Sequence, residues 1–290
     1  MPRFARILVA AVLLVVAAAQ YAAGAPRDPR LAAVRTFAFG IGDGALSGDV
    51  ATRFRDYDLV VVDGEGVTAA QVRRLRRGGR IVLGYLSVGT IENYRSWYPR
   101  AKAYALDPDA DWPGEWFADT SKAGYRTLIA GSVAPMILRK GLDGLFLDNV
   151  DMVEQHRAQR AGMFRLVRML RARLDAGRHR YLFAQNGEDV IGPIVRSLDG
   201  WNREDVTTAY DFGAQRYAPA TADAQAAALA ALRRMSRRGL LVTATDYTAN
   251  GDTGAFQEAV SAACAAGALP FVSDIGLRRI PATAPRCPSG

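Results

Sequence analysis

Histidine and cysteine are scarce in this chain of 290 residues, which contains two of each. His156 and His179 lie on or beside expected helices, away from the ends of the expected strands. This position disfavours a Ser-His-Asp triad and a histidine-ligated zinc site, because both need an imidazole among the reacting groups. A CxxC redox or metal motif is absent from the sequence as well. The sequence therefore predicts chemistry that uses no metal and no other cofactor.

Long apolar runs are missing after the N-terminus, where Ile7–Ala19 forms one uninterrupted run of 13 residues. Arg3 and Arg6 precede this run, and small residues follow it at 23–25. A bilayer-spanning helix needs about 20 apolar residues, so we interpret 1–25 as a cleaved secretory signal peptide. An uncleaved N-terminal anchor is the alternative. We expect a secreted or periplasmic protein with no stable membrane span after cleavage.

Basic residues exceed acidic ones only moderately. The chain has a net charge of +8, and removal of Arg3 and Arg6 leaves 35 basic against 29 acidic residues, or +6. Much of this excess lies in runs such as 73–77 and 165–173, which have the spacing of solvated helix faces. The basic runs lack interleaved aromatic residues, and the chain is expected to be secreted. We therefore expect no nucleic-acid partner.

The two cysteines, Cys264 and Cys287, both lie near the C-terminus. In an oxidising compartment such a pair predicts one disulfide, which would hold the tail, 277–290, against the last helix. Two free thiols are the alternative. We expect the protein to be a monomer.

Short apolar runs rich in β-branched residues alternate with amphipathic stretches along the rest of the chain. Eight runs are candidate strands: 36–42, 57–64, 80–89, 144–149, 181–187, 200–205, 240–247 and 268–276. The clearest candidate helices lie between them: Thr68–Arg77, Arg126–Lys140, Arg160–Ala176, Thr221–Arg238 and Thr253–Ala266.

These strands are apolar along their whole length, as expected for parallel strands that are covered on both faces. Eight of them predict an α/β fold that consists of a single (β/α)8 TIM barrel over 36–276, after an N-terminal linker at 26–35. An open doubly wound sheet is the competing fold, although no GxGxxG motif follows the first strand.

The longest stretch without periodicity is 91–125, which follows the third strand and should form a loop over one face of the barrel. Its aromatic side chains could stack on sugar rings, or could form a local core that covers the barrel mouth. The residues concerned are Tyr94, Trp97, Tyr98, Trp112, Trp116 and Tyr125.

Acids, amides and phenols follow the expected strands, at the end of a TIM barrel where active sites form. They are Asp63, Glu65, Tyr85, Ser87, Asp148, Asn149, Asp151, Gln185, Asn186, Glu204, Asp205, Asp246, Tyr247, Ser273 and Asp274. Glycoside hydrolysis is the chemistry that needs only carboxylates, one to protonate the leaving oxygen and one to attack or to activate water. Asp148 and Glu204 are the best placed pair, because each directly follows an apolar or aromatic strand body.

Acids at strand ends can also have purely structural roles, such as capping the next helix. Asp151 could cap a helix that begins near Met152. Asp58 and Asp143 precede their strands, and we interpret them as turn residues.

Several motifs together resemble glycoside hydrolase family 114, the endo-α-1,4-polygalactosaminidase family. They are VLGYLSVGTIENYRSWY, WPGEWFAD, GLDGLFLDNVDMVE, FAQNGED, GWNRED and VTATDY, in the same order and over most of the chain after the signal. The GxDGxxLDNVD stretch is the most specific of them. The chain departs from the family at Thr90, where an acid is common.

The resemblance implies a (β/α)8 barrel that cleaves α-1,4-linked galactosamine polymers with a retaining mechanism. By motif, Asp148 would be the nucleophile and Glu204 the acid/base. The residues expected to line the sugar cleft are Tyr85, Asn149, Asp151, Gln185, Asn186 and Tyr247. The implied partner is an amino-sugar polysaccharide, whose cationic units would need acids at the barrel mouth to outweigh the basic surface.

Two other functions remain open from the sequence. A barrel that binds polysaccharide without cutting it would keep the aromatic cleft but not the carboxylate geometry. A metal-assisted hydrolase would use Asp148 and Asp151 as oxygen ligands for Mg²⁺ or Ca²⁺.

Overall fold

A computed structural model describes residues 26, 28–176 and 181–288 of the chain. The expected signal peptide, 1–25, lies outside the described residues. Within the part of the chain that is described, no helix has both the length and the hydropathy to cross a bilayer.

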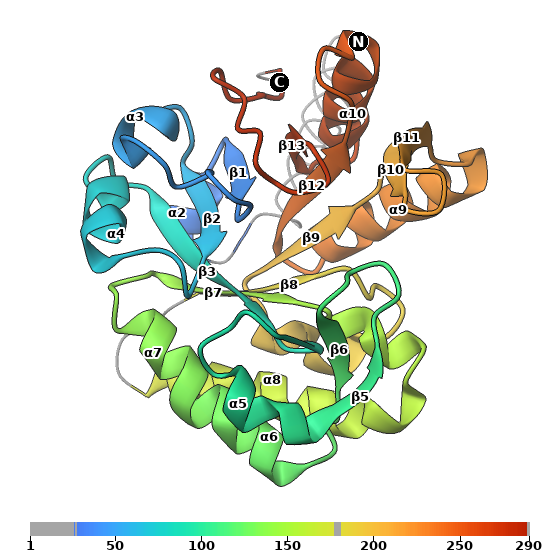
Figure 1. The fold of residues 1–290 in the computed structure, drawn as a ribbon. Helices are drawn as coiled ribbons and strands as arrows, with labels where there is room; N and C mark the ends of the chain where they lie inside the picture. Colours follow the sequence, from blue (N-terminus) through green and yellow to red (C-terminus); the bar gives the residue numbers. More distant parts are fainter. Residues whose placement is uncertain (1–25, 27, 177–180, 289–290) are drawn as a thin grey trace, which may run out of the picture.

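Eight parallel strands form the central sheet, and every neighbouring pair in their order is parallel. In sheet order they are β1 Phe37–Gly40, β2 Leu59–Asp63, β3 Ile81–Ser87, β7 Gly144–Asp148, β8 Tyr181–Gln185, β9 Gly200–Glu204, β12 Leu241–Tyr247 and β13 Leu269–Ser273. The sheet curves round until β13 lies beside β1, as Figure 1 shows. The predicted (β/α)8 barrel is confirmed, and each predicted strand contains one of these eight.

Large aromatic side chains fill the inside of the barrel. Phe37 of β1 packs edge-on against Phe271 of β13, with ring centroids 5.9 Å apart. Phe39 lies 4.8 Å from the ring of Phe146 across the barrel interior. Gly200 faces Phe183, and a Cβ there would come within 2.2 Å of the ring. These contacts close the barrel core below the strand ends that carry the polar residues.

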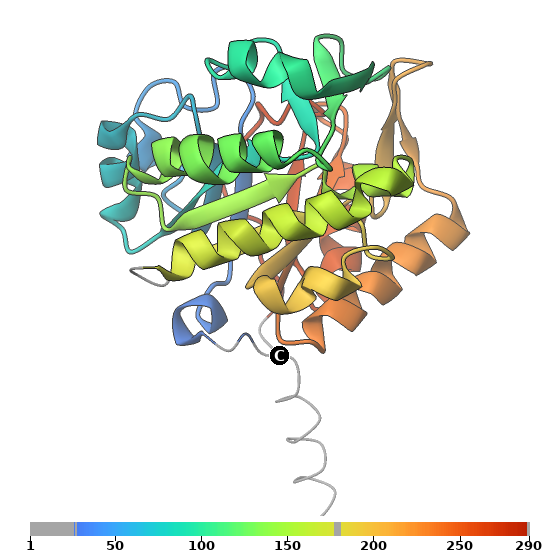
Figure 2. The same ribbon diagram turned by 90° about the horizontal axis from the view of Figure 1, so that it is seen from below.

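Helices surround the barrel between the strands (Figures 1 and 2). The main ones are α3 Val50–Arg53, α4 Ala69–Arg76, α6 Ala123–Leu128, α7 Ala134–Leu138, α8 Arg160–Asp175, α9 Ala222–Ser236 and α10 Thr253–Ala265. The helix predicted over 126–140 consists of α6 and α7 joined by a π-helical segment, η2 Ile129–Val133. The connection from β8 to β9 has only a 3₁₀ helix, η5 Gly192–Ser197. Two further 3₁₀ helices, η3 Val150–Glu154 and η4 Arg157–Gln159, lie between β7 and α8.

Two insertions rise from the strand ends. The stretch 91–125 was expected to be a loop, but most of it is structured. It contains α5 Tyr98–Ala101 and the 3₁₀ helix η1 Lys102–Tyr104, beside a three-stranded antiparallel sheet of β4 Thr90–Glu92, β6 Glu115–Ala118 and β5 Ala105–Pro108. A second insertion after β9 is the hairpin β10 Thr208–Asp211 and β11 Arg216–Pro219. In Figure 1 both stand at the same end of the barrel.

The opposite end of the barrel is closed by the N-terminal segment. The expected linker, 26–35, contains a short helix, α2 Pro29–Ala32, whose Leu31 is buried. Arg30 forms an ion pair with Asp143, whose carboxylate also accepts the Val82 backbone N–H.

Asp143 and Asp58, which the sequence analysis interpreted as turn residues, both bind backbone N–H groups at the start of a strand. Asp58 accepts the backbone N–H groups of Arg35 and Thr36 ahead of β1. Cys264 and Cys287 form the predicted disulfide, which ties the tail to α10.

Candidate active site

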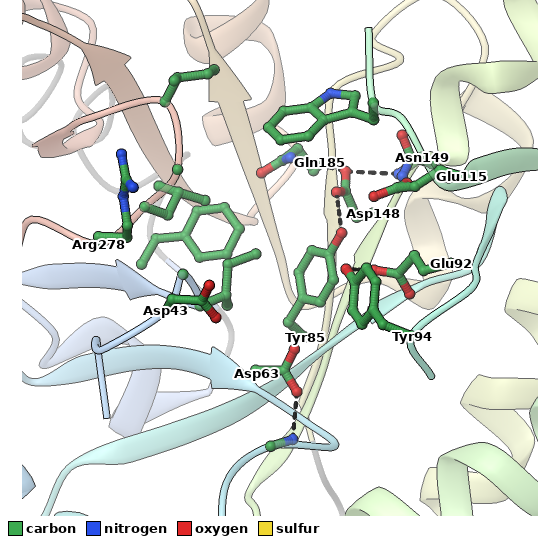
Figure 3. Close-up of a pocket in the computed structure, with 18 of the residues that line it drawn as sticks. Asp43, Asp63, Tyr85, Glu92, Tyr94, Glu115, Asp148, Asn149, Gln185 and Arg278 are labelled. Carbon is green, nitrogen blue, oxygen red and sulfur yellow. Dashed lines mark hydrogen bonds between the residues drawn. The ribbon is translucent and has the colours of Figure 1, made fainter. Parts of the chain in front are cut away.

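A cleft of about 1170 Å³ opens at the C-terminal ends of the strands. All eight residues that the sequence analysis assigned to the site line this cleft: Tyr85, Asp148, Asn149, Asp151, Gln185, Asn186, Glu204 and Tyr247. Figure 3 shows the two sides of the cleft, with Asp43 and Arg278 on one side and Glu92, Glu115 and Asp148 on the other.

Asp148 is the last residue of β7, and donors from neighbouring elements fix its carboxylate. The Tyr85 hydroxyl donates to Oδ2 at 2.7 Å, and the Gln185 amide donates to Oδ1 at 2.9 Å. The backbone N–H of Asn149 also donates to Oδ1, at 2.7 Å. Burial raises the pKa of Asp148, and these three hydrogen bonds oppose that shift because they favour the charged form. Asp148 therefore keeps one orientation and has strong support for its negative charge.

Glu204 ends β9 and has fewer donors than Asp148. Asn186 Nδ2 donates to Oε2 at 2.9 Å, and the Tyr247 hydroxyl donates to Oε1. Burial raises the pKa of Glu204 well above its usual value, and the negative charge of Asp148 raises it further. The two carboxylates therefore differ, because Glu204 is the one held closer to its protonated form.

A polar network supports the amides between the two carboxylates. Asn202 donates to Gln185 Oε1 at 2.9 Å and accepts the hydroxyls of Thr243 and Thr245. Asn202 and both threonines are fully buried. This chain of bonds fixes the amide of Gln185, which in turn orients Asp148.

The backbone turns sharply directly after three of the site residues. Asn149, Asn186 and Asp205 have φ values of 56°, 53° and 53°, in the left-handed region that Asn and Asp tolerate better than most residues. They immediately follow Asp148, Gln185 and Glu204, at the ends of β7, β8 and β9. These three strands therefore end at the residue whose side chain faces the cleft.

Asp151 lines the cleft and does not cap a helix that begins near Met152. The 3₁₀ helix η3 starts at Val150, with Asn149 at its cap position. Burial, followed by the charge of Asp148, raises the pKa of Asp151 to about 7. The alternative capping role is therefore wrong, and Asp151 adds a third carboxyl group near the strand ends.

Two acids of the first insertion, Glu92 and Glu115, also line the cleft, although the sequence analysis did not assign them to the site. The first, Glu92, is buried and accepts two bonds from Arg95, at 2.6 and 2.8 Å. Arg95 also pairs with Asp63 at 2.6 Å, and the Tyr94 hydroxyl donates to Glu92 at 2.7 Å. The positive charge of Arg95 is thus matched by two carboxylates inside the cleft wall.

The second acid, Glu115, points into the cleft beside Asp148 and Asn149 (Figure 3). Burial, followed by the charge of Glu92, raises the pKa of Glu115 to about 8, although Thr90 donates a hydrogen bond to it at 2.9 Å. Thr90 is the position at which the sequence departs from the resemblance described above. In this chain its hydroxyl instead orients the carboxyl group of Glu115.

Replacing Glu115 with glutamine is expected to make the free energy of unfolding less dependent on pH. Because burial raises the folded pKa from 4.5 to about 8, Glu115 stabilises the fold at low pH and loses that contribution as pH rises through about 8. At about 1.36 kcal/mol for each pKa unit, the stability of the variant relative to wild type should be higher above pH 8 than at pH 4 by up to about 5 kcal/mol. Chemical denaturation across this pH range measures it. Glu258→Gln, on the exposed face of α10, is the control, and equal pH dependence in both variants would contradict the shift.

Acidic residues outnumber basic ones in the lining of the cleft. Its lining contains the arginines Arg95 and Arg278 and nine acids: Asp43, Asp63, Glu65, Glu92, Glu115, Asp148, Asp151, Glu204 and Asp205. Arg278 pairs with Asp274 at 2.7 Å, and Arg95 is neutralised as described above. A chain with an overall charge of +8 thus has an acidic site.

Three other polar residues at strand ends, Asp246, Ser273 and Asp274, bind neighbouring loops and are not part of the cleft lining. Asp246 is buried and accepts the backbone N–H groups of Thr207 and Thr208, which fixes the base of the hairpin. Ser273 bonds to the Arg279 carbonyl and Asp274 to backbone N–H groups of the C-terminal turn. These residues are polar and lie at strand ends, as the sequence analysis noted, but they bind loop backbone groups.

Burial separates the aromatic residues of the first insertion. Trp97 and Tyr125 are buried in the local core, whereas Tyr94 and Trp112 are exposed and line the cleft. The local-core interpretation is therefore confirmed for Trp97 and Tyr125, whereas sugar stacking stays a prediction for Tyr94 and Trp112.

The donors around Asp148 leave little room for a cation. Both of its oxygens accept hydrogen bonds from protein groups. Across the described ranges, no group of three or more His, Cys, Asp or Glu residues is arranged to hold a metal ion.

Comparisons with known proteins agree with this architecture. An uncharacterized protein of Deinococcus radiodurans is 28% identical over 273 residues, covering 88% of this chain and 85% of the relative. The glycoside hydrolase domain of PelA from Pseudomonas aeruginosa has a similar fold, with a TM-score of 0.73 at 20% identity over 84% of this chain and 96% of that domain. Ega3 from Aspergillus fumigatus, solved in complex with galactosamine, gives 0.69 at 19% identity over 87% of this chain and 95% of its own.

A protein family matches almost the whole chain. The model of glycoside hydrolase family GH114 covers residues 17–287, a span that includes every strand of the barrel and both insertions. This chain belongs to glycoside hydrolase family GH114 and is a glycoside hydrolase.

Proposed function

We propose that this protein is a secreted, endo-acting, retaining glycosidase that cleaves an α-1,4-linked galactosamine-type polysaccharide. The observation that carries the proposal is the pair of half-buried carboxyl groups, Asp148 and Glu204, which end β7 and β9 in one cleft and differ in their hydrogen-bond support. Retaining glycosidases need this asymmetry, since one group must be ionised while the other holds a proton.

Asp148 acts as the nucleophile in this proposal. Its three donors favour the carboxylate, and the Tyr85 hydroxyl on Oδ2 and the Gln185 amide on Oδ1 fix the carboxylate so that one oxygen can face the sugar. Attack of that oxygen on the anomeric carbon forms a glycosyl ester as the glycosidic bond breaks. The raised pKa of Glu204 suits it to give its proton to the leaving oxygen. Glu204 then takes a proton from the water that cleaves the ester.

An amino sugar is the substrate class that best suits the acidic cleft. Unacetylated hexosamine units are cations, and the ionised carboxylates among the nine acids of the lining would attract them within a Debye length of about 8 Å. The similarity to Ega3, solved with galactosamine, supports the same class. Tyr85, Asn149, Asp151, Gln185, Asn186 and Tyr247 would contact the sugar.

Secretion is supported by two features. The N-terminal sequence has the pattern of a signal peptide, and the disulfide between Cys264 and Cys287 suits an oxidising compartment.

Incubation of the purified protein with a panel of amino-sugar polymers tests the proposal. We expect oligosaccharides from partly or fully deacetylated α-1,4-polygalactosamine, and not from the β-1,4-linked glucosamine polymer chitosan. Nuclear magnetic resonance of the first products should show the α-anomer, because a double displacement retains configuration. Binding without new reducing ends would contradict the enzymatic proposal, and release of the β-anomer would contradict retention.

A further inference from the structure

Trp112 is a large apolar side chain that the fold leaves exposed. It lies in the turn between β5 and β6 and is 42% exposed, whereas Trp97 and Trp201 are buried. The turn is tightly held, because the Glu115 N–H donates to the Trp112 carbonyl at 3.1 Å and the Asn93 N–H donates to the Gly114 carbonyl at 2.9 Å. Exposure of this ring therefore does not result from a loose loop.

The second insertion provides a partner for this indole. Phe212, at the end of β10, packs against Trp112 with ring centroids 5.3 Å apart and the rings at 68°. Tyr210 and Tyr217 continue the row of rings along the hairpin, each contact being 5.1 Å. The Tyr217 hydroxyl then accepts the N–H of Ile275 in the loop after β13. The row of rings therefore connects the first insertion, the hairpin and the loop after β13.

Trp112 and Phe212 both line the cleft that contains the two carboxylates. The first insertion follows β3, next to β7 with Asp148, and the hairpin follows β9 with Glu204. The ring contact therefore joins insertions that follow strands on the two sides of β8, which lies between β7 and β9. A polymer chain lying in the cleft would thus pass beneath or beside the indole.

An edge-on aromatic contact fixes the plane of an indole without covering both of its faces. A flat apolar ring with a fixed orientation is suited to stack on the C–H face of a pyranose. Stacking also benefits from a cationic amine near the indole. The acidic lining would place such amines in the cleft, as argued above.

We propose that Trp112, oriented by Phe212, is a stacking platform for one hexosamine ring of the bound polymer. This platform determines affinity for the chain rather than the chemistry of the cut. The inference rests on the proposed function, because it concerns how the same cleft holds its substrate.

Polymer binding and hydrolysis by W112A test the platform. We expect KM for polygalactosamine to rise about 10-fold, or about 1.4 kcal/mol, with kcat changed less than 3-fold, because a stacking contact stabilises the bound ground state and the transition state alike. W112F should recover part of the loss, since it restores a flat ring. F212A should give an intermediate rise. Met169→Ala, an exposed apolar residue on α8 outside the cleft lining, is the matched control and should equal wild type.

The two proposals can fail separately. If wild type releases no products, the proposed function fails, and affinity of wild type and W112A for the oligomers can still be compared by calorimetry. Equal KM and equal affinity in wild type and W112A would overturn the platform while leaving the hydrolase in place. A W112F variant no better than W112A would overturn it too, because a flat apolar ring would then not be what matters. Thermal unfolding of each variant confirms that the fold is intact.

Discussion

Replacement of Asp148 by asparagine is expected to reduce kcat for polymer cleavage by about 10⁴-fold or more, because an amide cannot form the glycosyl ester. Asparagine has nearly the same size as aspartate and can keep the bond from Asn149, so substrate binding should change little. Reducing-end release under single-turnover conditions measures the loss. A small anion such as azide, added to an Asp148→Ala variant whose shorter side chain leaves room for it, should restore part of the activity by attacking the anomeric carbon in place of Asp148. The glycosyl azide formed should have the inverted configuration.

Asp148→Asn should not unfold the protein. Burial raises the pKa of Asp148, so its charge at neutral pH disfavours the folded state, and the neutral amide removes that cost. We therefore expect an unfolding temperature at pH 7 equal to or above that of wild type. Asp223→Asn, exposed on α9, is the control for both measurements. Hydrolysis by Asp148→Asn at the wild-type rate would remove Asp148 as the nucleophile.

The barrel strands could be predicted because they are buried on both sides. The run 59–62 is apolar throughout and is followed by Asp63 and a glycine, so its length and type can be recognised locally. The insertion strands could not be predicted in the same way. β5 and β11 have four residues each and are mostly half-buried or exposed, and they show neither a continuous apolar run nor alternation. Their pairing depends on contacts that the local sequence does not encode.

The residues of the candidate site likewise differ in whether the local sequence predicts their position. Asp148 and Glu204 could be found because each ends a barrel strand, and strand ends of a parallel barrel meet at one rim. Glu92 and Glu115 reach the rim from the insertion, and their positions depend on the register that pairs the two residues across β4 and β6. Both acids stand within motifs of the family, IENYR and WPGEWFAD, and those motifs were the one signal that could have found them.

The sharp turns after β7, β8 and β9 are marked in the sequence by the residue that follows each strand. Three of the strand-end residues are followed by Asn or Asp at positive φ, in the pairs Asp148-Asn149, Gln185-Asn186 and Glu204-Asp205. Since these residue types tolerate positive φ, the three pairs mark where a strand stops. Asp246 shows the limit of the pattern. It lies one residue before the end of β12, so its side chain faces away from the cleft lining, and it binds backbone N–H groups of the hairpin.

Glu204→Gln is expected to fail in a different way from Asp148→Asn, because an acid/base residue acts on the leaving group and on water. With the polymer, whose leaving alcohol must be protonated, kcat/KM should fall about 10²–10⁴-fold. With an aryl glycoside, whose phenolate leaves without a proton, formation of the glycosyl ester should be much less affected. The pH profile separates the roles further. Since the pKa of Glu204 is raised well above its usual value, wild-type kcat/KM should fall as pH rises and Glu204 loses its proton.

Glutamine cannot titrate, so this alkaline limb should be absent from Glu204→Gln with the aryl substrate, while the acid limb set by Asp148 remains. Glu258→Gln should keep both limbs. An unchanged alkaline limb in Glu204→Gln would assign the proton to another carboxyl group of the cleft. Glu115, with a pKa of about 8 and a position beside Asp148, would then be the residue to replace next.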